Sequence, residues 1–410
     1  MSGDPGPRTL VIAMVGLPAS GKSTVAAKIA QCLESEGAAV RVFNNGDVRR
    51  SMLGGRESSD PFFYSGDNAQ GVALREKIAR VNMERAGQYL QGGGQVAILD
   101  ATNVSRARRA LIARAMAGHR VLFLECVNTD PELVAASIGR KAQLPEFAHL
   151  SRAEAEECFR ARIRYYERIY EPLDGEDEVI VLDSVDNRIL RERVGARLPF
   201  FGVLRDLLVS EWVRNLYLVR HGETFFNLEK RIGGDPDLTP RGLAQAEALA
   251  RHFRDVPLNW IFVSTRRRTR QMAQALCRGR EECSIVPLAE LDEIDAGVCD
   301  AMTYDQIARE MPQVHARRQH DKFNTVYPGG EGYAALARRV ARGVNKALYL
   351  SGNAQHIMIV GHQAVNRTVL SRFLFRRQED VPFIHIPQDR YFHIVSTQTR
   401  KVFELVQFMS

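Results

Sequence analysis

The sequence predicts an α/β protein of two domains, and three observations support this prediction. Apolar runs of strand length alternate with helical patterns from residue 8 to residue 183, as in a parallel sheet with helices on both faces. A glycine-rich loop joins the first apolar run to the first helical stretch. The alternation starts again at residue 216, and a chain of 410 residues suits two domains of roughly 100–200 residues each.

The expected elements follow in chain order. The strands of the first half are expected at 8–15, 39–44, 95–100, 120–127 and 178–183. A helix is expected after the glycine loop, a second at 75–91, and a closing helix at 188–213. We therefore place the domains at 1–213 and 214–410. The second half is expected to have strands at 216–219, 260–264 and 357–361, and helices at 240–254, 268–277, 333–350 and 364–375.

Composition narrows the class of protein. No apolar run approaches the roughly 20 residues that span a bilayer, and the first residues lack the pattern of a signal peptide. The six cysteines, Cys277 and Cys283 among them, show no metal-binding spacing, so we expect reduced thiols in a cytoplasmic protein. The net charge of +7 suits small anionic substrates as well as nucleic acid.

A phosphate-binding loop is predicted after the first strand. The stretch GLPASGKST matches G-x-x-x-x-G-K-[ST] between a strand and a helix, the context in which this pattern is specific. Backbone N–H groups of such a loop surround phosphates, Lys22 reaches the outer phosphates, and the Ser23 hydroxyl can bind Mg²⁺. The predicted nucleotide site comprises Gly16, Leu17, Pro18, Ala19, Ser20, Gly21, Lys22, Ser23 and Thr24.

Asp100 ends the third strand of the first half. A carboxylate there suits a place beside the γ-phosphate and Mg²⁺, although an aspartate at a strand end is about as often a helix cap. Thr102 and Arg108 follow closely, and Arg50 and Arg75 add further cations that could hold an anionic acceptor. Most single arginines, however, only solvate a surface.

A histidine stands among arginines at the start of the second half. The stretch LYLVRHGE places Arg220 and His221 at the end of a predicted strand, where α/β sheets bind ligands. A basic cluster in STRRRTRQMA and a second histidine, His362 in GHQAVNR, follow two other strands, and Glu293 is a candidate proton donor. One RHG turn alone could arise by chance. Together these groups predict phosphoryl transfer through a phosphohistidine.

Nine motifs resemble the bifunctional 6-phosphofructo-2-kinase/fructose-2,6-bisphosphatase family: GLPASGKST, FNNGDVRR, LDATNVSRARR, YEPLD, RHGET, IGGD, LDEIDAGVCDAMTY, YPGGEGY and GHQAVNR. The resemblance covers nearly the whole chain, and the second half alone is similar to the histidine phosphatase (phosphoglycerate mutase) superfamily. It implies an N-terminal kinase domain with a P-loop NTPase-type parallel sheet and a C-terminal phosphoglycerate-mutase-like α/β domain.

For the kinase domain, the resemblance implies ATP with Mg²⁺ as cofactor, with Ser23 and Asp100 as metal ligands. Asp100 would also be catalytic. Fructose 6-phosphate would be bound by Arg50, Arg75, Thr102, Arg108, Lys141, Arg162 and Tyr166.

For the phosphatase domain, the resemblance implies no cofactor. His221 would carry the 2-phosphoryl group of fructose 2,6-bisphosphate, and Glu293 would protonate the leaving oxygen. The transferring phosphoryl group would be stabilised by Arg220, Asn227, Arg268, His362 and Gln363. Gly233 lies in the same loop, and the sugar with its 6-phosphate would be bound by Tyr304, Arg318, Lys322, Tyr333 and Arg367.

Three positions depart from the family pattern. Asn128 replaces a cysteine of the kinase site, Val326 replaces an arginine before YPGG, and Ser65 lies in a stretch that lacks an arginine often found before the Asp-Asn pair. The missing cation at Val326 could weaken binding of the bisphosphate.

Two alternatives stay open. One is a P-loop kinase fused to a phosphatase for other phosphoesters, or a chain in which only one activity is significant. The other is a non-catalytic sensor of sugar phosphates, which the presence of Lys22, His221 and Glu293 disfavours. The expected partners are the two fructose phosphates. We expect no nucleic acid and no membrane, and dimers of relatives make a homodimer a further expectation.

Overall fold

The computed structural model describes residues 9–59, 61–64, 67–374 and 376–409, so Ser65 lies outside the described residues. The chain divides into two compact units between Ser210 and Glu211. The boundary expected from the sequence, after residue 213, falls at the first residue of the first strand of the second unit. Each unit is described by itself below.

The first unit is built on a mainly parallel sheet with strand order β2-β3-β1-β4-β5-β6. Its strands are β1 (Leu10–Val15), β2 (Val40–Asn44), β3 (Val96–Asp100), β4 (Arg120–Val127), β5 (Val179–Asp183) and β6 (Arg188–Arg193). Its α-helices are α1 (Lys22–Ser35), α2 (Asn45–Ser59), α3 (Ala69–Gln91), α4 (Arg106–Ala115), α5 (Pro131–Lys141), α6 (Arg152–Arg168) and α7 (Phe201–Val209). Two short 3-10 helices are η1 (Pro61–Tyr64) and η2 (Pro145–Phe147).

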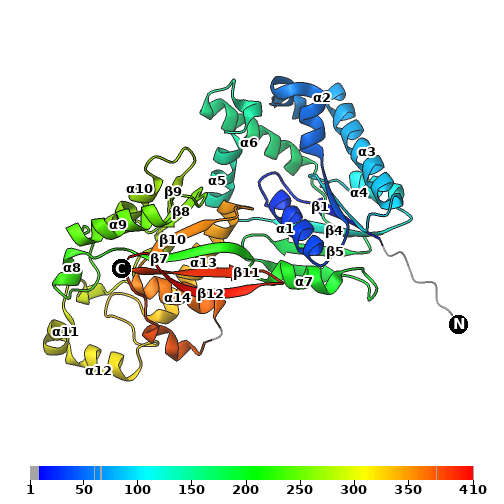
Figure 1. Ribbon diagram of the computed structural model, residues 1–410. Coiled ribbons are helices and arrows are strands. Elements are labelled where there is room, and N and C mark those ends of the chain that lie inside the picture. Colours follow the sequence, from blue (N-terminus) through cyan, green and yellow to red (C-terminus); the bar gives the residue numbers. More distant parts are fainter. Residues whose placement is uncertain (1–8, 60, 65–66, 375, 410) are drawn as a thin grey trace. The chain divides into compact units, whose positions relative to one another are not determined.

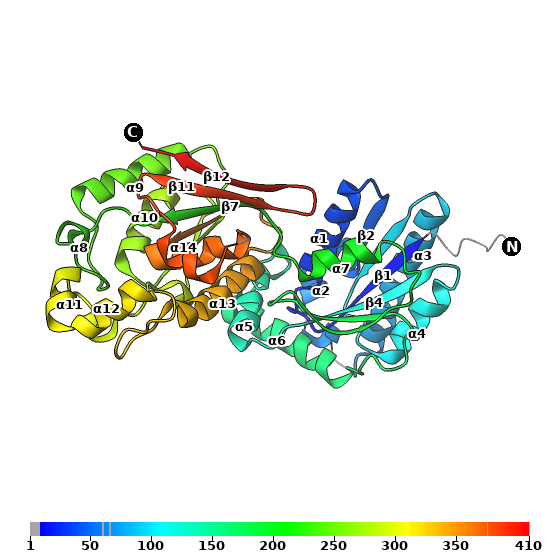
Figure 2. The same ribbon diagram turned by 90° about the horizontal axis from the view of Figure 1, so that it is seen from below.

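Strand β1 lies between β3 and β4 because its residues are apolar on both faces, and all six are buried. On one face, Val11, Ala13 and Val15 pack with side chains of α3 and α4. Helix α1 instead packs with α7, and the two are seen together in Figure 2. The carboxyl ends of β1 and β3 therefore emerge between two helical layers.

The prediction of a closing helix at 188–213 is wrong for the first part of this range. Residues Arg188–Arg193 form the edge strand β6, antiparallel to β5, and the helix is confined to Phe201–Val209. The Asp183 carboxylate accepts hydrogen bonds from the backbone N–H groups of Val185 and Asp186, and Asn187 adopts a φ of 48°. This turn reverses the chain. The strand was missed because an exposed edge strand rich in arginine carries no apolar signal.

The second unit has a sheet with strand order β12-β11-β7-β10-β8-β9. Its strands are β7 (Val213–Arg220), β8 (Trp260–Val263), β9 (Ser284–Pro287), β10 (Ile357–Gly361), β11 (Arg390–Ser396) and β12 (Lys401–Gln407). Its α-helices are α8 (Phe225–Leu228), α9 (Pro240–His252), α10 (Arg267–Cys277), α11 (Tyr304–Glu310), α12 (Pro312–His320), α13 (Tyr333–Ser351) and α14 (Gln363–Phe373). Its 3-10 helices are η3 (Ala289–Leu291), η4 (Gly297–Cys299) and η5 (Gln378–Phe383).

Helices cover this sheet on both faces (Figure 1). Helices α9 and α10 pack against one face, on which Tyr217, Val219 and Val360 are buried, whereas α13 and α14 pack with each other. Strands β7, β10 and β8 are parallel neighbours, so their carboxyl ends meet at one edge of the sheet. In the part of the chain that the structure describes, no helix combines the length and apolar character needed to cross a membrane.

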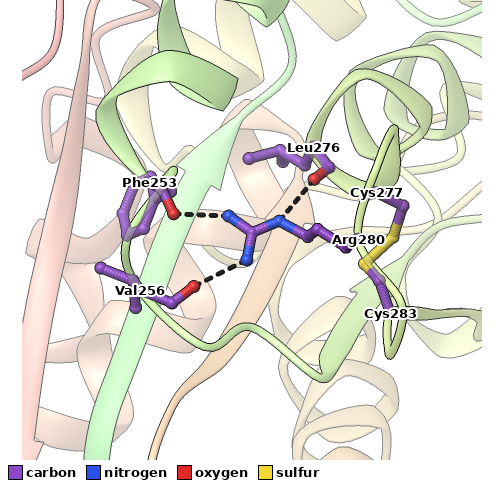
Figure 3. Close-up of a disulfide and its surroundings, with 6 residues drawn as sticks. All are labelled: Phe253, Val256, Leu276, Cys277, Arg280 and Cys283. Atoms are coloured by element: carbon purple, nitrogen blue, oxygen red, sulfur yellow. Dashed lines mark hydrogen bonds between the residues drawn. A yellow bond between two sulfur atoms is a disulfide. The ribbon is translucent and has the colours of Figure 1, made fainter.

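The expectation that all cysteines are reduced thiols is wrong for one pair. Cys277 at the end of α10 and Cys283 just before β9 form a disulfide, with their Cα atoms 5.4 Å apart (Figure 3). Between them, the Arg280 guanidinium donates to the carbonyl oxygens of Leu276 (2.8 Å), Val256 (2.7 Å) and Phe253. The spacing resembles no redox or metal motif, so only the folded turn reveals the pair.

Candidate active sites

The loop between β1 and α1 has the backbone of a phosphate-binding loop. Gly16, Ala19 and Gly21 have φ values of 133°, 67° and 83°, which turn the chain tightly around the loop. A Cβ atom on Gly16 would lie 2.4 Å from the Cys126 carbonyl oxygen of the neighbouring β4. Position 16 therefore needs glycine for both its conformation and its space.

Lys22 begins α1 and is buried. Its Nζ donates to the Leu17 carbonyl oxygen (2.5 Å) and lies 3.4 Å from Ser20 Oγ. Burial lowers the pKa of Lys22 to about 8, and the opposing charge of Asp100 raises it. A phosphate oxygen that replaces the Leu17 carbonyl would bring a stronger acceptor to the same ammonium group.

Asp100 lies beside this loop. The parallel pairing of β2 and β3 aligns Asn44 with Asp100, and Asn44 Nδ2 donates to an oxygen of the Asp100 carboxylate. Ser23 is exposed in the first turn of α1, next to Lys22. A carboxylate and a hydroxyl beside a phosphate-binding loop are the donor set that Mg²⁺ takes together with phosphate oxygens. These residues fit the expected metal.

Several residues expected to bind the acceptor gather around aromatic rings. The Arg162 guanidinium lies 4.8 Å from the ring centroid of Tyr64, and Tyr166 packs against the same ring at 6.1 Å. The Arg75 guanidinium donates to Tyr165 Oη (2.9 Å) and lies 4.6 Å from that ring. Arg162 Nε is buried without a hydrogen-bond partner among the described residues, which points to an anion beside it.

Lys141 and Arg50 lie within electrostatic reach of this group. Burial lowers the pKa of Lys141, and the charges of Arg162, Arg140 and Arg50 lower it further, against the opposing effect of Asp100. Arg50 bonds to Asp47 (2.6 Å). Lys141, Arg162 and Arg50 are therefore close enough for their charges to act on one another.

Sequence reasoning missed Glu146, which anchors this region. Its carboxylate accepts from Arg49 Nη2 (2.7 Å) and lies 3.6 Å from Arg50, while Arg49 also donates to Tyr64 Oη. Glu146 and the Arg49 side chain are buried. No pattern in PEF signals this role, because the pair is joined only through the fold.

Two other expected kinase residues, Arg108 and Thr102, have different surroundings, and Asn128 is one of the departures from the family pattern. Arg108 forms an ion pair with Glu76. The Thr102 carbonyl oxygen accepts from the Gly16 N–H (3.1 Å), so Thr102 supports the loop through its backbone. Asn128, where the resemblance implies a cysteine, accepts from the Asp130 N–H (2.9 Å) just before α5.

The second site is built on the carboxyl ends of β7, β10 and β8. His221 directly follows β7, and its N–H donates to the carbonyl oxygen of Gly361 at the end of β10 (3.0 Å). His221 Nδ1 lies 2.8 Å from the Gly222 carbonyl oxygen. A carbonyl only accepts, so Nδ1 carries the proton and Nε2 keeps its lone pair.

The imidazole of His221 is held neutral. Burial lowers its pKa well below 6.5, and the charges of Arg268 and Arg220 lower it further. The ring of His362 lies 5.2 Å away, and burial followed by the charge of Arg268 lowers its pKa as well. A neutral, oriented imidazole between guanidinium groups is suited to attack a phosphorus atom.

The orientation of His362 is fixed at both ring nitrogens. Arg268 Nε donates to His362 Nδ1 (3.2 Å), so His362 Nε2–H donates to Ser264 Oγ (2.8 Å). Arg268 Nη1 donates to the Gly234 carbonyl oxygen (2.8 Å). Ser264 was not among the predicted residues. Its position at the end of β8 was the signal that could have found it.

Glu293 is held by the N-terminus of α14. Its carboxylate oxygens accept from the backbone N–H groups of Gln363 (3.1 Å) and Ala364 (3.2 Å). Burial lowers the pKa of Arg220 to about 10, and the negative charge of Glu293 raises it. Arg220 therefore lies within electrostatic reach of Glu293. Arg220 Nη1 donates to the Ile386 carbonyl oxygen (3.1 Å), and its buried Nε lacks a partner within the described residues.

Asn227 is joined to His221 by a residue that sequence reasoning missed. Gln388 Nε2 donates both to Asn227 Oδ1 (3.1 Å) and to the His221 carbonyl oxygen (3.1 Å). Gly233 adopts a φ of 71°, and a Cβ atom there would lie 1.6 Å from a carboxylate oxygen of Asp300. Glycine is therefore favoured at position 233, because a side chain would strain the backbone and displace the Asp300 carboxylate.

A second group of cations lies on α12, α14 and the loop after α12. Arg367 donates to Tyr333 Oη (3.0 Å), and the Arg318 guanidinium lies 3.9 Å from the ring centroid of Tyr327. Burial lowers the pKa of Lys322 to about 8, assisted by the charges of Arg367 and Arg318.

The positive charges of Arg318, Lys322 and Arg367 lie close together, which indicates a site for a doubly charged anion. Tyr304 is half-exposed, and Val326 is 57% exposed.

The geometry defines a two-site phosphoryl-transfer protein, with a P-loop in one unit and an arginine-flanked histidine in the other. Sequence comparison agrees. Residues 5–198 match the family model of 6-phosphofructo-2-kinase, and residues 216–408 match the histidine phosphatase superfamily (branch 1). The chain belongs to the 6-phosphofructo-2-kinase/fructose-2,6-bisphosphatase family, as its relatives show.

The relatives match over most of their length. "6-phosphofructo-2-kinase/fructose-2,6-bisphosphatase 4" of Rattus norvegicus is 35% identical over 392 residues, which cover 92% of this chain and 80% of that protein. Protein 1 of the same name from Bos taurus is 34% identical over 389 residues, with the same coverage. Among solved structures, a putative alpha-ribazole-5'-P phosphatase from Escherichia coli covers 48% of this chain and 96% of that chain, with 23% identity and a TM-score of 0.44.

Proposed function

We propose that this chain synthesises fructose 2,6-bisphosphate from fructose 6-phosphate and ATP, hydrolyses it back to fructose 6-phosphate and phosphate, and so controls glycolysis and gluconeogenesis. The observation that carries this proposal is one chain with both a phosphate-binding loop and a neutral histidine between arginines, in a family whose members carry both names. The two reactions oppose each other, so the chain sets the level of one sugar bisphosphate.

In the kinase reaction, the 16–24 loop holds the phosphates of ATP, and Lys22 binds the outer phosphate oxygens. Ser23 and Asp100 would hold Mg²⁺, which would supply positive charge against the phosphate oxygens. Arg50, Arg75, Lys141, Arg162 and Tyr166 hold fructose 6-phosphate so that its 2-hydroxyl faces the γ-phosphorus. The rate then depends mainly on positioning and on the cations around the transferring group.

In the phosphatase reaction, His221 Nε2 attacks the phosphorus of the 2-phosphate. The bond between phosphorus and the C2 oxygen breaks, and that oxygen takes a proton from Glu293. Water then attacks the phosphohistidine, gives its proton to Glu293 and releases phosphate. Arg220, Arg268, Asn227, His362 and Gln363 stabilise the charge on the moving phosphoryl group, while Arg318, Lys322 and Arg367 hold the 6-phosphate. No cofactor takes part in this scheme.

The position of the label tests this scheme. Fructose 2,6-bisphosphate labelled at the 2-phosphate is mixed with the protein and quenched within milliseconds to seconds. We expect acid-labile label on His221, found by peptide mapping, and none when the label is at the 6-phosphate. Label elsewhere in the protein, or from the 6-position, would contradict the assignment of His221.

A phosphatase for other phosphoesters, including nucleic-acid ends, is the competing function. Its support in the sequence was the arginine run 266–268. Arg267 pairs with Asp235 and Asp237, and Arg268 bonds to His362. These bonds direct the run toward its own unit, which favours the sugar bisphosphate. A panel of phosphoesters, with salt-dependent oligonucleotide binding, tests the alternative.

We also propose a cytoplasmic location, where ATP and hexose phosphates are available, and a homodimer. Sedimentation velocity of the purified protein tests the dimer, because a monomer of 46.1 kDa and its dimer separate clearly.

A further inference from the structure

Arg339 of α13 lies against the backbone of the segment that carries Glu293. Its Nη1 donates to the carbonyl oxygens of Asp292 (2.9 Å), Glu290 (3.0 Å) and Ala289 (3.3 Å). Its Nη2 lies 3.4 Å from the carbonyl oxygen of Glu293 itself. Residues 293–296 form neither helix nor strand, so no regular hydrogen-bond ladder fixes them.

Arg339 has a carboxylate partner that holds the same segment from its other end. The Arg339 guanidinium and the Glu331 carboxylate form a half-buried ion pair. Glu331 also accepts from the Asp295 N–H (3.1 Å), and its own N–H donates to the Asp295 carbonyl oxygen (2.9 Å). The ion pair therefore bonds to the backbone on both sides of Glu293.

The side chain of Glu293 depends on this backbone. Its carboxylate accepts from the N–H groups of Gln363, Ala364 and Ile294. A displacement of the 289–295 backbone would therefore move the carboxylate relative to α14 and to the substrate. A shift of about 1 Å in a reacting group can cost about 10²-fold in rate.

We propose that Arg339, together with Glu331, is a positioning residue for the proton donor Glu293. The inference rests on the proposed role of Glu293 in phosphoryl transfer to His221. Arg339 touches neither substrate nor the reacting atoms in this scheme. It holds the irregular segment so that the carboxylate meets the leaving C2 oxygen.

The test uses leaving groups that differ in their need for a proton. Phosphorylation of His221 is measured in single turnovers with fructose 2,6-bisphosphate and with 2,4-dinitrophenyl phosphate, whose phenolate leaves without protonation. In Arg339→Leu we expect phosphorylation by the bisphosphate to slow about 10²-fold, and phosphorylation by the aryl phosphate to change less than about 3-fold. Equal slowing with both substrates would overturn the proposal.

Arg280→Leu is the matched control. Arg280 is also half-buried, lies in the same unit and donates to backbone carbonyls, but these belong to Phe253, Val256 and Leu276 (Figure 3). Its loss is expected to leave the ratio of the two phosphorylation rates unchanged. Should Arg339→Leu fail to fold, Arg339→Lys and Glu331→Gln remove only part of the bonding, and each is expected to slow the bisphosphate reaction selectively.

The variant Glu293→Gln distinguishes the proposed role of Glu293 from the proposed role of Arg339. If Glu293→Gln slows only the bisphosphate reaction, the double variant with Arg339→Leu should be no slower than Glu293→Gln alone, within about 2-fold, because both changes act on one step. Additive losses would overturn the inference and leave the role of Glu293 intact. If Glu293→Gln slows both substrates equally, the role of Glu293 and the inference fall together.

Discussion

Burial lowers the pKa of a basic side chain in each site, but it favours the reactive form of that side chain in one site and opposes it in the other. It lowers the pKa of Lys22 in the first unit to about 8, and it lowers the pKa of His221 in the second well below 6.5. His221 must be neutral to attack phosphorus, so desolvation prepares it. Lys22 must be charged to bind phosphate, so desolvation opposes its reactive form, while the Asp100 carboxylate and the incoming phosphates favour the charged ammonium group. The phosphatase site is therefore preorganised by its own chain, whereas the kinase site depends more on its ligands.

Removal of the nucleophile His221 is expected to have the largest effect on the difference between the two sites. His221→Ala should lower hydrolysis of fructose 2,6-bisphosphate by at least about 10⁴-fold, because no other group supplies the attacking lone pair. The kinase rate should change less than about 2-fold. His320→Ala, at an exposed histidine of the same unit, is the control and should leave both rates unchanged.

Loss of the P-loop ammonium group should be smaller, because the loop N–H groups still hold the phosphates. Lys22→Ala should slow the kinase about 10²–10³-fold, the range for one electrostatic donor, and leave the hydrolysis rate intact. Initial rates with saturating ATP check this, with Lys77→Ala at an exposed lysine as control. A kinase within about 3-fold of the parent would show that Lys22 does not reach the transferring phosphate.

The disulfide stabilises the second unit in a way that has no counterpart described in the first. Cys277 and Cys283 lie 6 positions apart in the sequence, and closing so short a loop contributes about 2 kcal/mol in the chain-entropy model. Cys283→Ser should lower the free energy of unfolding by that amount in urea titrations. Reductant should destabilise the parent equally and leave Cys283→Ser unchanged. A parent insensitive to reductant would contradict the contribution.

The pH dependence of His221 phosphorylation tests how far burial lowers the pKa of His221. The reactive form of His221 is neutral, and its pKa lies well below 6.5, so the acid limb of His221 phosphorylation should also lie well below pH 6.5. An ordinary histidine would lose about tenfold by about pH 5.5. Single-turnover rates from fructose 2,6-bisphosphate give the midpoint. Arg268→Leu removes a neighbouring charge and should move that midpoint upward, whereas a parent midpoint at pH 6.5 would contradict the account.

The smallest expected effect concerns Val326. The side chain is exposed, and the resemblance implies an arginine at this position, so a cation there is expected to add one exposed contact to the 6-phosphate. Val326→Arg should lower KM for fructose 2,6-bisphosphate about 3–5-fold with kcat unchanged, in keeping with roughly 1 kcal/mol for an exposed ion pair. Val209→Arg, at an exposed valine of the first unit, is the control. An unchanged KM would show that position 326 lies outside the pocket.

The sequence predicted the parts of the fold that carry strong apolar patterns. Buried strands such as β1 and β10 are continuous apolar runs, and the loop after β1 has a specific motif, so their places were clear. The edge strand β6 was missed because its arginines face solvent, and β11 and β12 were missed because their polar residues interrupt the runs. An exposed edge strand needs no apolar face, so periodicity cannot find it.

The site residues divide in the same way, into those that sequence motifs predict and those that only the fold reveals. Lys22 lies in a specific motif, whereas His221 and Glu293 were predicted only together with Arg220 and His362, and their roles in phosphoryl transfer stay predictions. Glu146 and Gln388 act through partners far away in the chain: Glu146 binds Arg49, and Gln388 bridges His221 and Asn227. Only tertiary structure brings such partners together, so one sequence could not reveal them.

The central claim is that one chain makes and destroys the same bisphosphate. The most direct test gives the protein γ-labelled ATP, Mg²⁺ and fructose 6-phosphate, and follows label in sugar, protein and free phosphate. The parent should pass label from ATP to the sugar, then to His221, then to phosphate. In His221→Ala, label should accumulate in acid-labile fructose 2,6-bisphosphate, and in Lys22→Ala label should leave ATP about 10²–10³-fold more slowly than in the parent. If His221→Ala forms no acid-labile sugar phosphate, or Lys22→Ala labels His221 from ATP as fast as the parent does, the account of two opposed sites is contradicted.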